Sequence, residues 1–401
     1  MGIVSALGAN VDENLQSLLA SRSGIAPLHY LQTSRTEFPV GEVKMTNEEM
    51  MRLLNIPENE PTIRTALMGI LALRETLNHG GLNVQSPDRN DGAKIALVSG
   101  TTVGGMDKSE QYYKDFLEND TRNVYISTHD CGTCTEMIAD YFGIFSQLDT
   151  ISTACSSAAN AIILGAELLK SGRADIVVAG GSECITKFHL NGFNTLMILD
   201  REPCRPFDAT RAGLNLGEGA AYVVMETLEN FKKRSQKNPA LTALCMISGY
   251  ANTCDAFHQT ASSPDGKGAY LAMKKALENA NLLPQDIDYI NAHGTGTTNN
   301  DLSEGTAIAR IFGENIPPVS SSKSFTGHTT SASGCVEAII SILALQHNFI
   351  PTNLNFSEKM PDLPFMPAVD QQPVKPLKNI LKNSFGFGGN NTSLIFSKID
   401  T

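Results

Sequence analysis

The sequence lacks any apolar run long enough to cross a membrane, and it lacks an excess of positive charge. A membrane-spanning helix takes about 18–20 consecutive apolar residues, and no run in this chain of 401 residues reaches that length. Acidic residues outnumber basic ones by 42 to 31, which gives a formal net charge of −11. Proteins that bind nucleic acid usually have a basic surface, because the phosphates are negative. An acidic composition such as this one does not favour such a surface. We therefore expect a protein that binds neither membranes nor nucleic acid.

The patterns that mark metal and nucleotide sites are missing as well. Cys131 and Cys134 form a close pair, but no second pair of cysteines or histidines stands at zinc-site spacing. A redox or zinc site at this pair is therefore a minor alternative. No glycine-rich segment has the dinucleotide-binding pattern. The eight cysteines are scattered through a large chain, which is typical of a reducing compartment, so we expect a cytoplasmic protein without a metal ion or a resident cofactor.

What the sequence does contain is a cysteine between a strand-like and a helix-like segment. Cys155 follows the β-prone run DTIST (149–153) and precedes small residues that continue as a helical stretch to about residue 171. A thiol at a helix N-terminus lies near unpaired backbone N–H groups and the positive end of the helix dipole. Both lower the pKa of a thiol, so we expect a nucleophilic thiolate at Cys155. Taken alone, such a cysteine is more often a small buried apolar residue.

Two histidines in glycine-rich settings follow far downstream. His293 lies in NAHGTGT (291–297), and His328 ends the segment KSFTGH (323–328). A single histidine after a strand-like run is usually a hydrogen-bonded structural residue. A cysteine together with two histidines indicates covalent acyl chemistry instead, because such sets are assembled in space from distant parts of a chain.

Short motifs accompany these residues in a fixed order. They are VSGTTVGG (98–105), TACSS (153–157), VAGGSE (178–183), RPFD (205–208), GEGA (217–220) and NSFGFGGN (383–390). With the two histidine motifs, they resemble the β-ketoacyl-acyl-carrier-protein synthases, the condensing enzymes of the thiolase fold. The resemblance covers nearly the whole chain. The use of two histidines is similar to the elongating branch, because initiating enzymes pair cysteine with histidine and asparagine.

The resemblance implies an α/β protein of the thiolase fold, with two pseudo-symmetric halves in α-β-α-β-α layers. We place one half at residues 1–240, with the cysteine, and the other at 241–401, with both histidines. Each half is expected to contain a five-stranded sheet. Apolar patterning predicts strands at 95–100, 176–181 and 220–226, and helices at 62–79, 135–142, 158–171 and 266–280. We expect surface loops at 55–61, 83–91 and the charged stretch 229–239.

The N-terminus departs from the family pattern. Residues 1–8, MGIVSALG, have neither the basic region nor the long apolar core of a signal peptide. In the family, a short strand precedes such a stretch. We therefore expect a central strand of the first sheet to be missing or replaced.

The reaction that the resemblance implies is a decarboxylative condensation. An acyl group moves from a carrier-protein thioester to Cys155, and a malonyl thioester then loses CO₂. The resulting carbanion attacks the acyl-enzyme, which gives a chain two carbons longer. The backbone N–H groups of Cys155 and Phe387 match the family's oxyanion hole, while His293 and His328 match the groups that stabilise the malonyl enolate.

The remaining residues of the implied site have supporting parts. Lys323 and Glu304 match charges that orient the histidines, although each could be an ordinary ion-pair residue. Thr295 and Thr297 match hydroxyls that contact the phosphopantetheine arm of the carrier. Asp301 stands in a helix-start context, where we expect it to cap the helix and not to catalyse.

Two aromatic residues match positions around the acyl chain. Phe387 corresponds to the gating aromatic of the family. Phe193 aligns with an aromatic of the acyl pocket, and ordinary core packing would explain it nearly as well.

The implied partners are an acyl carrier protein and a second copy of the chain in a homodimer. Two other functions stay open. A biosynthetic thiolase uses a second cysteine near its C-terminus, and this chain has none after Cys335. A non-catalytic chain-length partner subunit usually loses the nucleophile, which is retained here as Cys155.

The region expected to meet the carrier has little positive charge. Relatives that serve the housekeeping fatty-acid carrier tend to have lysines and arginines before the position of Thr65. Here IPENEPTIR (56–64) has one basic residue against two acidic ones, and Met197 lies near a position that is commonly basic. Because carrier proteins are acidic, we expect a dedicated carrier of a secondary pathway, such as polyene or polyketide synthesis, or docking through Lys108, Lys114 and Arg205.

Overall fold

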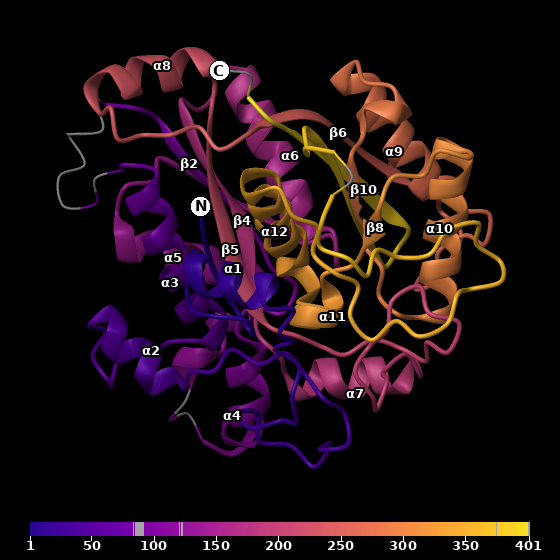
Figure 1. Ribbon diagram of the computed structural model, residues 1–401. Helices are drawn as coiled ribbons and strands as arrows, with labels where there is room; N and C mark the ends of the chain where they lie inside the picture. Colours follow the sequence, from indigo (N-terminus) through magenta and orange to yellow (C-terminus); the bar gives the residue numbers. More distant parts are fainter. Residues whose placement is uncertain (83, 85–91, 120, 122, 374, 400–401) are drawn as a thin grey trace.

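The computed structural model of the protein describes residues 1–82, 84, 92–119, 121, 123–373 and 375–399, and its framework is a pair of five-stranded sheets (Figure 1). The first sheet has the order β1 (Gly2–Ser5), β5 (Gly219–Glu226), β4 (Ile176–Glu183), β2 (Ile95–Gly100) and β3 (Gln147–Ile151). The second has the order β6 (Met246–Cys254), β10 (Asn390–Ser397), β9 (Asn379–Gly386), β7 (Tyr289–Asn291) and β8 (Val319–Ser320).

The two sheets have the same pattern of strand directions as well as the same order. In each, the first three strands in that order pair antiparallel and the last three pair parallel. This repeat is the pseudo-symmetry that the family resemblance implied.

Helices lie between the sheets and on their outer faces. In the middle, α6 (Ser157–Lys170) packs on β4 and β2, while α12 (Ser333–His347) packs on α6, β5 and β9 (Figure 1). On the outer faces, α3 (Arg64–His79) covers β1 and β5, and α9 (Lys267–Ala280) covers β6 and β10. The order of layers is therefore α-β-α-β-α, which confirms the expected thiolase fold.

The remaining helices surround this framework. They are α1 (Val11–Leu19), α2 (Asn47–Leu54), α4 (Met106–Glu118), α5 (Cys131–Phe142), α7 (Lys187–Thr195), α8 (Leu228–Lys237), α10 (Thr298–Phe312) and α11 (Lys323–Thr326). In the described ranges, none of the helices is both long and apolar enough to cross a membrane.

The central helix α12 is buried along almost its whole length. Every residue from Ser333 to Leu345 is buried, and apart from Glu337 the segment consists of small, apolar and hydroxyl residues. A helix that is apolar on all sides belongs in a protein interior. A carboxylate in such a helix must be paired, since an unpaired buried charge is costly. Glu337 is therefore a residue whose partners need explanation.

The expected strands and helices are present, with ends that shift by a few residues. The charged stretch 229–239 is an exception, because most of it forms α8 and not a loop. Thr227 caps this helix by accepting a hydrogen bond from the N–H of Asn230. Arg234 anchors it through an ion pair with Glu226 (2.6 Å). The expectation of solvent exposure was right, since α8 contains no buried residue, but the prediction of a loop was wrong.

The two other expected loops have different outcomes. Residues 55–61 contain neither helix nor strand and are largely exposed, as predicted. The segment 83–91 lies outside the described residues apart from residue 84.

A strand is present at the N-terminus and the first sheet has five strands, so of the expected alternatives, a missing or a replaced strand, the missing strand was wrong. Residues Gly2–Ser5 form β1, which pairs antiparallel with β5 at the edge of the first sheet and is buried throughout. The N–H of Ile3 also donates to Glu75 of α3 (3.0 Å). A Cβ atom on Gly2 would lie 2.2 Å from the carbonyl oxygen of Ala72, so only glycine allows this strand to lie so close to α3.

Candidate active site

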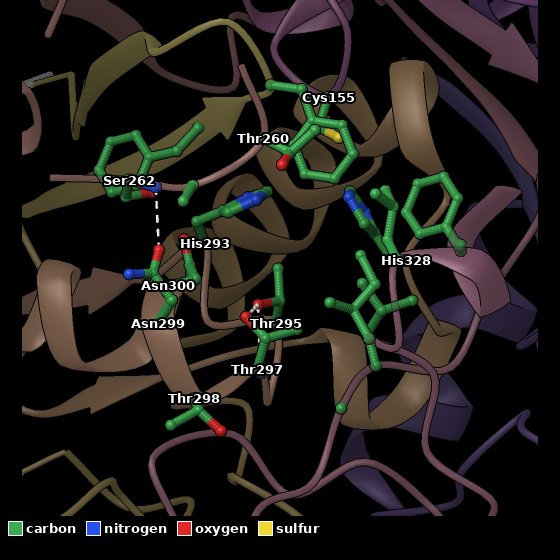
Figure 2. Close-up of a pocket in the computed structure, with 18 of the residues that line it drawn as sticks. Cys155, Thr260, Ser262, His293, Thr295, Thr297, Thr298, Asn299, Asn300 and His328 are labelled. Atoms are coloured by element: carbon green, nitrogen blue, oxygen red, sulfur yellow. Dashed lines mark hydrogen bonds between the residues drawn. The ribbon is translucent and has the colours of Figure 1, made fainter. Parts of the chain in front are cut away.

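A cavity of about 310 Å³ brings together residues from both halves of the chain (Figure 2). The predicted site residues that line it are Cys155, Phe193, His293, Thr295, Thr297, His328 and Phe387. Figure 2 shows the imidazoles of His293 and His328 below Cys155, with Thr295 and Thr297 further from the sulfur. Lys323 and Glu304 are not part of the wall, but both contact His293 from behind.

Cys155 lies in the turn between β3 and α6. The preceding Ala154 has a positive φ of 50°, which makes the turn tight, and Ser156 is the N-cap residue of α6. Only 6% of Cys155 is exposed. Burial raises the pKa of its thiol to about 12, and the nearby Lys323 ammonium and the N–H of Phe387 offset only part of that rise. The expected lowering of this pKa was therefore wrong, because desolvation outweighs the end of one helix.

A small polar alkylating reagent should react slowly with Cys155 near neutral pH. We expect iodoacetamide to modify the exposed Cys254 first. The rate at Cys155 should rise about tenfold for each pH unit between pH 7 and pH 9, because the thiolate fraction increases tenfold per pH unit as long as the pH is well below the pKa. Peptide mass spectrometry resolves both rates. A rate at Cys155 that is already level over this interval would mean that the resting residue is a thiolate after all.

The backbone at Phe387 approaches the nucleophile closely. Its N–H lies close enough to the sulfur of Cys155 to lower the pKa of the thiol. A Cβ atom on the preceding Gly386 would lie 2.9 Å from the carbonyl oxygen of Thr153, so glycine is needed for the approach. The ring of Phe387 stacks on Phe193 with centroids 5.8 Å apart. Both rings line the cavity, so Phe193 is more than a core-packing residue.

The two histidines are buried side by side. His293 follows β7 and His328 follows α11, and their ring centroids lie 5.3 Å apart at an interplanar angle of 83°. Burial and the positive charge of Lys323 hold the pKa of both imidazoles well below the ordinary value. Both rings are therefore neutral at pH 7.

Lys323 fixes the tautomer of His293. Its ammonium lies 3.2 Å from Nδ1 of His293 and donates to the carbonyl oxygen of the same residue (2.5 Å). An ammonium has no lone pair to accept a hydrogen bond. Nδ1 must therefore be the acceptor, and the proton of the neutral imidazole is on Nε2.

Glu304 holds the main chain at His293 and does not contact the imidazole. Its carboxylate accepts hydrogen bonds from the N–H groups of His293 (2.9 Å) and Gly294 (2.8 Å), and from the amide of Asn383 (3.0 Å). Burial raises the pKa of Glu304 to about 7, and these three donors offset part of that rise. Its orientation of His293 thus acts through the backbone.

The acidic partner of Lys323 is Glu337, a residue that the sequence motifs did not indicate. The two side chains form a buried ion pair. Ser333, one turn earlier on α12, donates to Oε1 of Glu337 (3.0 Å), and its Oγ lies 3.3 Å from Nδ1 of His328. A single carboxylate therefore reaches both histidines through one neighbour each. A lone charge in an apolar helical stretch was the sequence signal that could have found it.

Hydroxyl and amide groups form the part of the cavity that lies away from Cys155. The hydroxyls of Thr295 and Thr297 lie 2.8 Å apart. The N–H of Ser262 donates to Asn299 (2.9 Å), and both residues line the cavity (Figure 2). This side can form hydrogen bonds with a polar chain such as a series of amides.

Asp301 is neither the helix cap that was expected nor a cavity residue. The N-cap of α10 is Thr297, and Asp301 lies inside the first turn. Its buried carboxylate accepts hydrogen bonds from the N–H groups of Phe207 (2.7 Å) and Gly296 (3.2 Å). Asp301 thus joins the loop that follows His293 to the segment around Phe207.

The pair Cys131 and Cys134 stands in the first turns of α5. Burial raises the pKa of both thiols, and that of Cys134 well above its ordinary value. Within the part of the chain that the structure describes, no three or more His, Cys, Asp or Glu side chains are grouped to hold a metal ion.

Known proteins share this architecture and these motifs. The N-terminal domain of beta-ketoacyl synthase matches residues 1–230, and the C-terminal domain of beta-ketoacyl synthase matches residues 244–357. This chain belongs to the β-ketoacyl synthase family. The motif resemblance in the sequence is thereby confirmed.

Full-length relatives of this β-ketoacyl synthase are similar along the whole chain. It is 32% identical to 3-oxoacyl-[acyl-carrier-protein] synthase 2 of Coxiella burnetii, with 100% of this chain and 97% of the relative covered. It is 33% identical to the synthase of the same name from Vibrio cholerae, with 100% and 98% covered. The solved structure of the ishigamide ketosynthase/chain length factor is 28% identical, with a TM-score of 0.88 over 100% of this chain and 98% of that chain.

Proposed function

We propose that this β-ketoacyl synthase condenses a malonyl group on a carrier protein with an acyl group held on Cys155, which extends the acyl chain by two carbons. The observation that carries this function is the convergence of Cys155 with two neutral histidines on one buried cavity.

In the first step, the sulfur of Cys155 attacks the carbonyl carbon of an acyl thioester. The oxyanion that forms accepts hydrogen bonds from the N–H groups of Cys155 and Phe387. The pantetheine sulfur then leaves with the proton that the thiol has lost. The N–H of Phe387 already points at the sulfur, and such a donor typically contributes about 10²–10³-fold to the rate.

In the second step, the malonyl thioester carbonyl takes the place of the departed thioester. The Nε2–H of His293 donates to its oxygen. His328 can donate from Nε2 to the same oxygen when the hydroxyl of Ser333 turns its proton from Glu337 to Nδ1 of His328, which lies 3.3 Å away. As CO₂ leaves, its bonding electrons form an enolate that these groups stabilise. The enolate carbon attacks the acyl carbonyl, and the Cys155 thiolate is released as the new carbon–carbon bond forms.

The two ends of the cavity suit the two parts of the substrate. Thr295 and Thr297 contribute hydroxyls that can bind the amides of a phosphopantetheine arm, which arrives on the carrier protein. Phe193 and Phe387 line the side suited to an acyl chain. These steps require the substrates and the side chains of the protein, and no other cofactor.

We also propose that two copies of the chain form a homodimer. Large apolar side chains are exposed on α4 and on the segment that follows it, namely Tyr113, Leu117, Val124 and Ile126. Exposed apolar groups of this kind are typical of protein interfaces. The alternative to a homodimer is a complex with a related but different partner subunit, since the ishigamide structure is named for a ketosynthase and a chain length factor. Eight free cysteines favour a cytoplasmic location.

The proposed function also includes the carrier protein, which we propose to be a dedicated one and not the housekeeping fatty-acid carrier. The one basic residue of segment 56–64, Arg64, is bound to Glu218 (2.6 Å) and its side chain is only 11% exposed. Arg205 pairs with Asp200 (3.3 Å). Met197, at the cavity mouth, is 87% exposed. These two arginines therefore offer an acidic carrier little free positive charge, which leaves Lys108 and the exposed Lys114 of α4 as the alternative docking residues.

The choice of carrier can be measured with purified proteins. Acyl and malonyl groups are loaded on the housekeeping fatty-acid carrier and on a carrier encoded beside this gene, and β-ketoacyl product is followed by mass spectrometry. We expect turnover with the neighbouring carrier to be at least about tenfold faster, since lost charge pairing lowers encounter rates by that order. Equal or faster turnover with the housekeeping carrier would leave ordinary fatty-acid elongation. Absence of product with both would contradict the proposed reaction itself.

A further inference from the structure

A second lysine lies behind the two histidines, on the side away from the cavity. Lys382 belongs to β9, inside the second sheet, and its side chain is completely buried. Its ammonium forms an ion pair with Oε2 of Glu337 (3.0 Å) and contacts the hydroxyl of Ser384. In the sheet, Lys382 is directly paired with Asn291 of β7, whose amide donates to the main chain of Glu337 (3.1 Å). This face of the sheet thus meets α12 at Glu337.

The charges in this cluster do not balance. Glu337 already has one ammonium partner in Lys323, and Lys382 supplies a second. Because both histidines are neutral, the one carboxylate of Glu337 is shared by two ammonium groups, and burial lowers the pKa of Lys382. Removing an ammonium from water costs several kcal/mol, and a buried ion pair is often no better for stability than apolar residues of the same volume. Stability alone therefore gives no reason for the second lysine.

The two oxygens of Glu337 have different tasks. Oε2 faces Lys382, whereas Oε1 contacts Lys323 and Ser333, the neighbours of the two histidines. If Oε2 lost its partner, the carboxylate could rotate about its last bond. The contacts on Oε1 that orient Lys323 and Ser333 would then no longer be fixed.

We propose that Lys382 is a positioning residue for the condensation step, which it serves by holding Glu337 so that Lys323 and Ser333 orient His293 and His328. This role rests on the proposed function of the cavity. It has a second effect, because a carboxylate shared between two ammonium groups neutralises Lys323 only in part. Lys323 therefore keeps positive charge near the place where the enolate forms.

The field of Lys382 also acts on the histidines. Lys323 on α11 and Lys382 on β9 lower the pKa of both imidazoles, and His189 on α7 lowers that of His328. Two acidic groups lie near the histidines. Glu337 on α12 binds Lys323, and Glu304 on α10 accepts a hydrogen bond from the backbone N–H of His293. Loss of the Lys382 charge should raise the histidine pKa values. Because the reaction needs neutral imidazoles, the acid limb of the rate profile should move to higher pH.

The first test is Lys382→Met, which keeps most of the length of the side chain and removes the charge. The control is Lys378→Met, the same change at an exposed residue of the same segment. We expect Lys382→Met to lower condensation by about tenfold or more, since a positioned proton donor contributes ~10²–10⁴-fold. Acylation of Cys155, followed by intact-protein mass, should stay within about threefold of the parent, because it does not use the histidine donors. The acid limb should shift upward in this variant and not in the control.

The second test separates the charge from the packing. In Lys382→Ala, a small space remains beside Oε2 of Glu337, so ammonium or methylammonium added to the assay should restore part of the condensation rate. The same salts should not restore Lys382→Met, in which the side chain fills the space, and tetramethylammonium should not restore either variant. This rescue remains a valid test even if Lys382→Met folds poorly.

Two results would overturn the role of Lys382. One is a Lys382→Met protein with the condensation rate and pH profile of the parent. The other is a parallel loss of acylation and condensation that follows the folded fraction in thermal unfolding, without rescue of Lys382→Ala. Failure of the proposed function is distinguishable from both, since the parent protein would then form neither acyl-Cys155 nor β-ketoacyl product.

Discussion

Replacement of Cys155 by alanine should abolish acyl transfer and chain elongation. Acylated protein should be undetectable by intact mass, and elongation should fall by about 10³-fold or more, because removal of a nucleophile eliminates the covalent route. The site is buried and already contacts the N–H of Phe387, so the smaller side chain fits and the fold should be retained. Cys131→Ala is the matched control, since it removes a thiol outside the cavity and should leave both rates unchanged.

Cys155→Gln should separate the two halves of the reaction. Its amide can occupy the place of the acyl group and bind the N–H groups of the oxyanion hole, while His293 and His328 remain. We therefore expect continued release of CO₂ from malonyl-carrier protein without condensation. Cerulenin should label the parent at Cys155 and neither variant. A folded parent that resists cerulenin would favour the non-catalytic partner subunit, and near-normal elongation by either variant would remove Cys155 from the mechanism.

The sequence was sufficient to locate the parts of the site but not their electrostatics. Cys155, His293 and His328 each lie in a glycine-rich or small-residue turn after a strand or short helix, a context that can be recognised from each segment alone. The pKa of Cys155 was misjudged because the helix end is a local property, whereas burial depends on everything packed around the residue. Desolvation of this kind is the larger effect.

The residues that could not be predicted from the sequence are those whose partners lie on a different helix, strand or loop. Glu337 lies on α12, where it is the lone charge of an apolar stretch, and Lys382 lies on β9, but neither sequence segment shows that the other residue is its partner. They become a pair only because α12 packs on β9. Asp301 was misjudged for the same reason, since its partner Phe207 is distant in the sequence. Such contacts follow from the fold and not from local propensity.

The repeat in the fold explains where the site lies. Cys155 precedes α6 in the first half, and the segment from Lys323 to Ala332 precedes α12 in the second. These two helices occupy equivalent positions and pack against each other in the central layer (Figure 1). Their starts therefore lie close together, so the nucleophile from one half meets His328 from the other. The strand repeat could be anticipated from the family resemblance alone, but this meeting requires the packed layers.

Replacement of either histidine by alanine should block condensation while Cys155 can still be acylated. The enolate would lose one of its stabilising groups, and we expect condensation to fall by about 10²–10⁴-fold. Acylation depends on the sulfur and the oxyanion hole, so an acyl-enzyme should still accumulate and be visible by intact mass. His347→Ala, at the exposed end of α12, is the matched control and should behave as the parent.

The two variants should also differ from each other. His293→Ala leaves the ammonium of Lys323 without its imidazole partner next to the cavity, whereas His328→Ala removes only a neighbour of Ser333. The proton that Lys323 donates to the imidazole is then free to be donated to the malonyl carbonyl, so His293→Ala should retain more decarboxylation than His328→Ala. Lys323→Met in the His293→Ala background should remove that residual activity. Normal condensation by either single variant would exclude the corresponding histidine from the mechanism, whereas failure of both to form acyl-Cys155 would assign the histidines to the first step instead of the second.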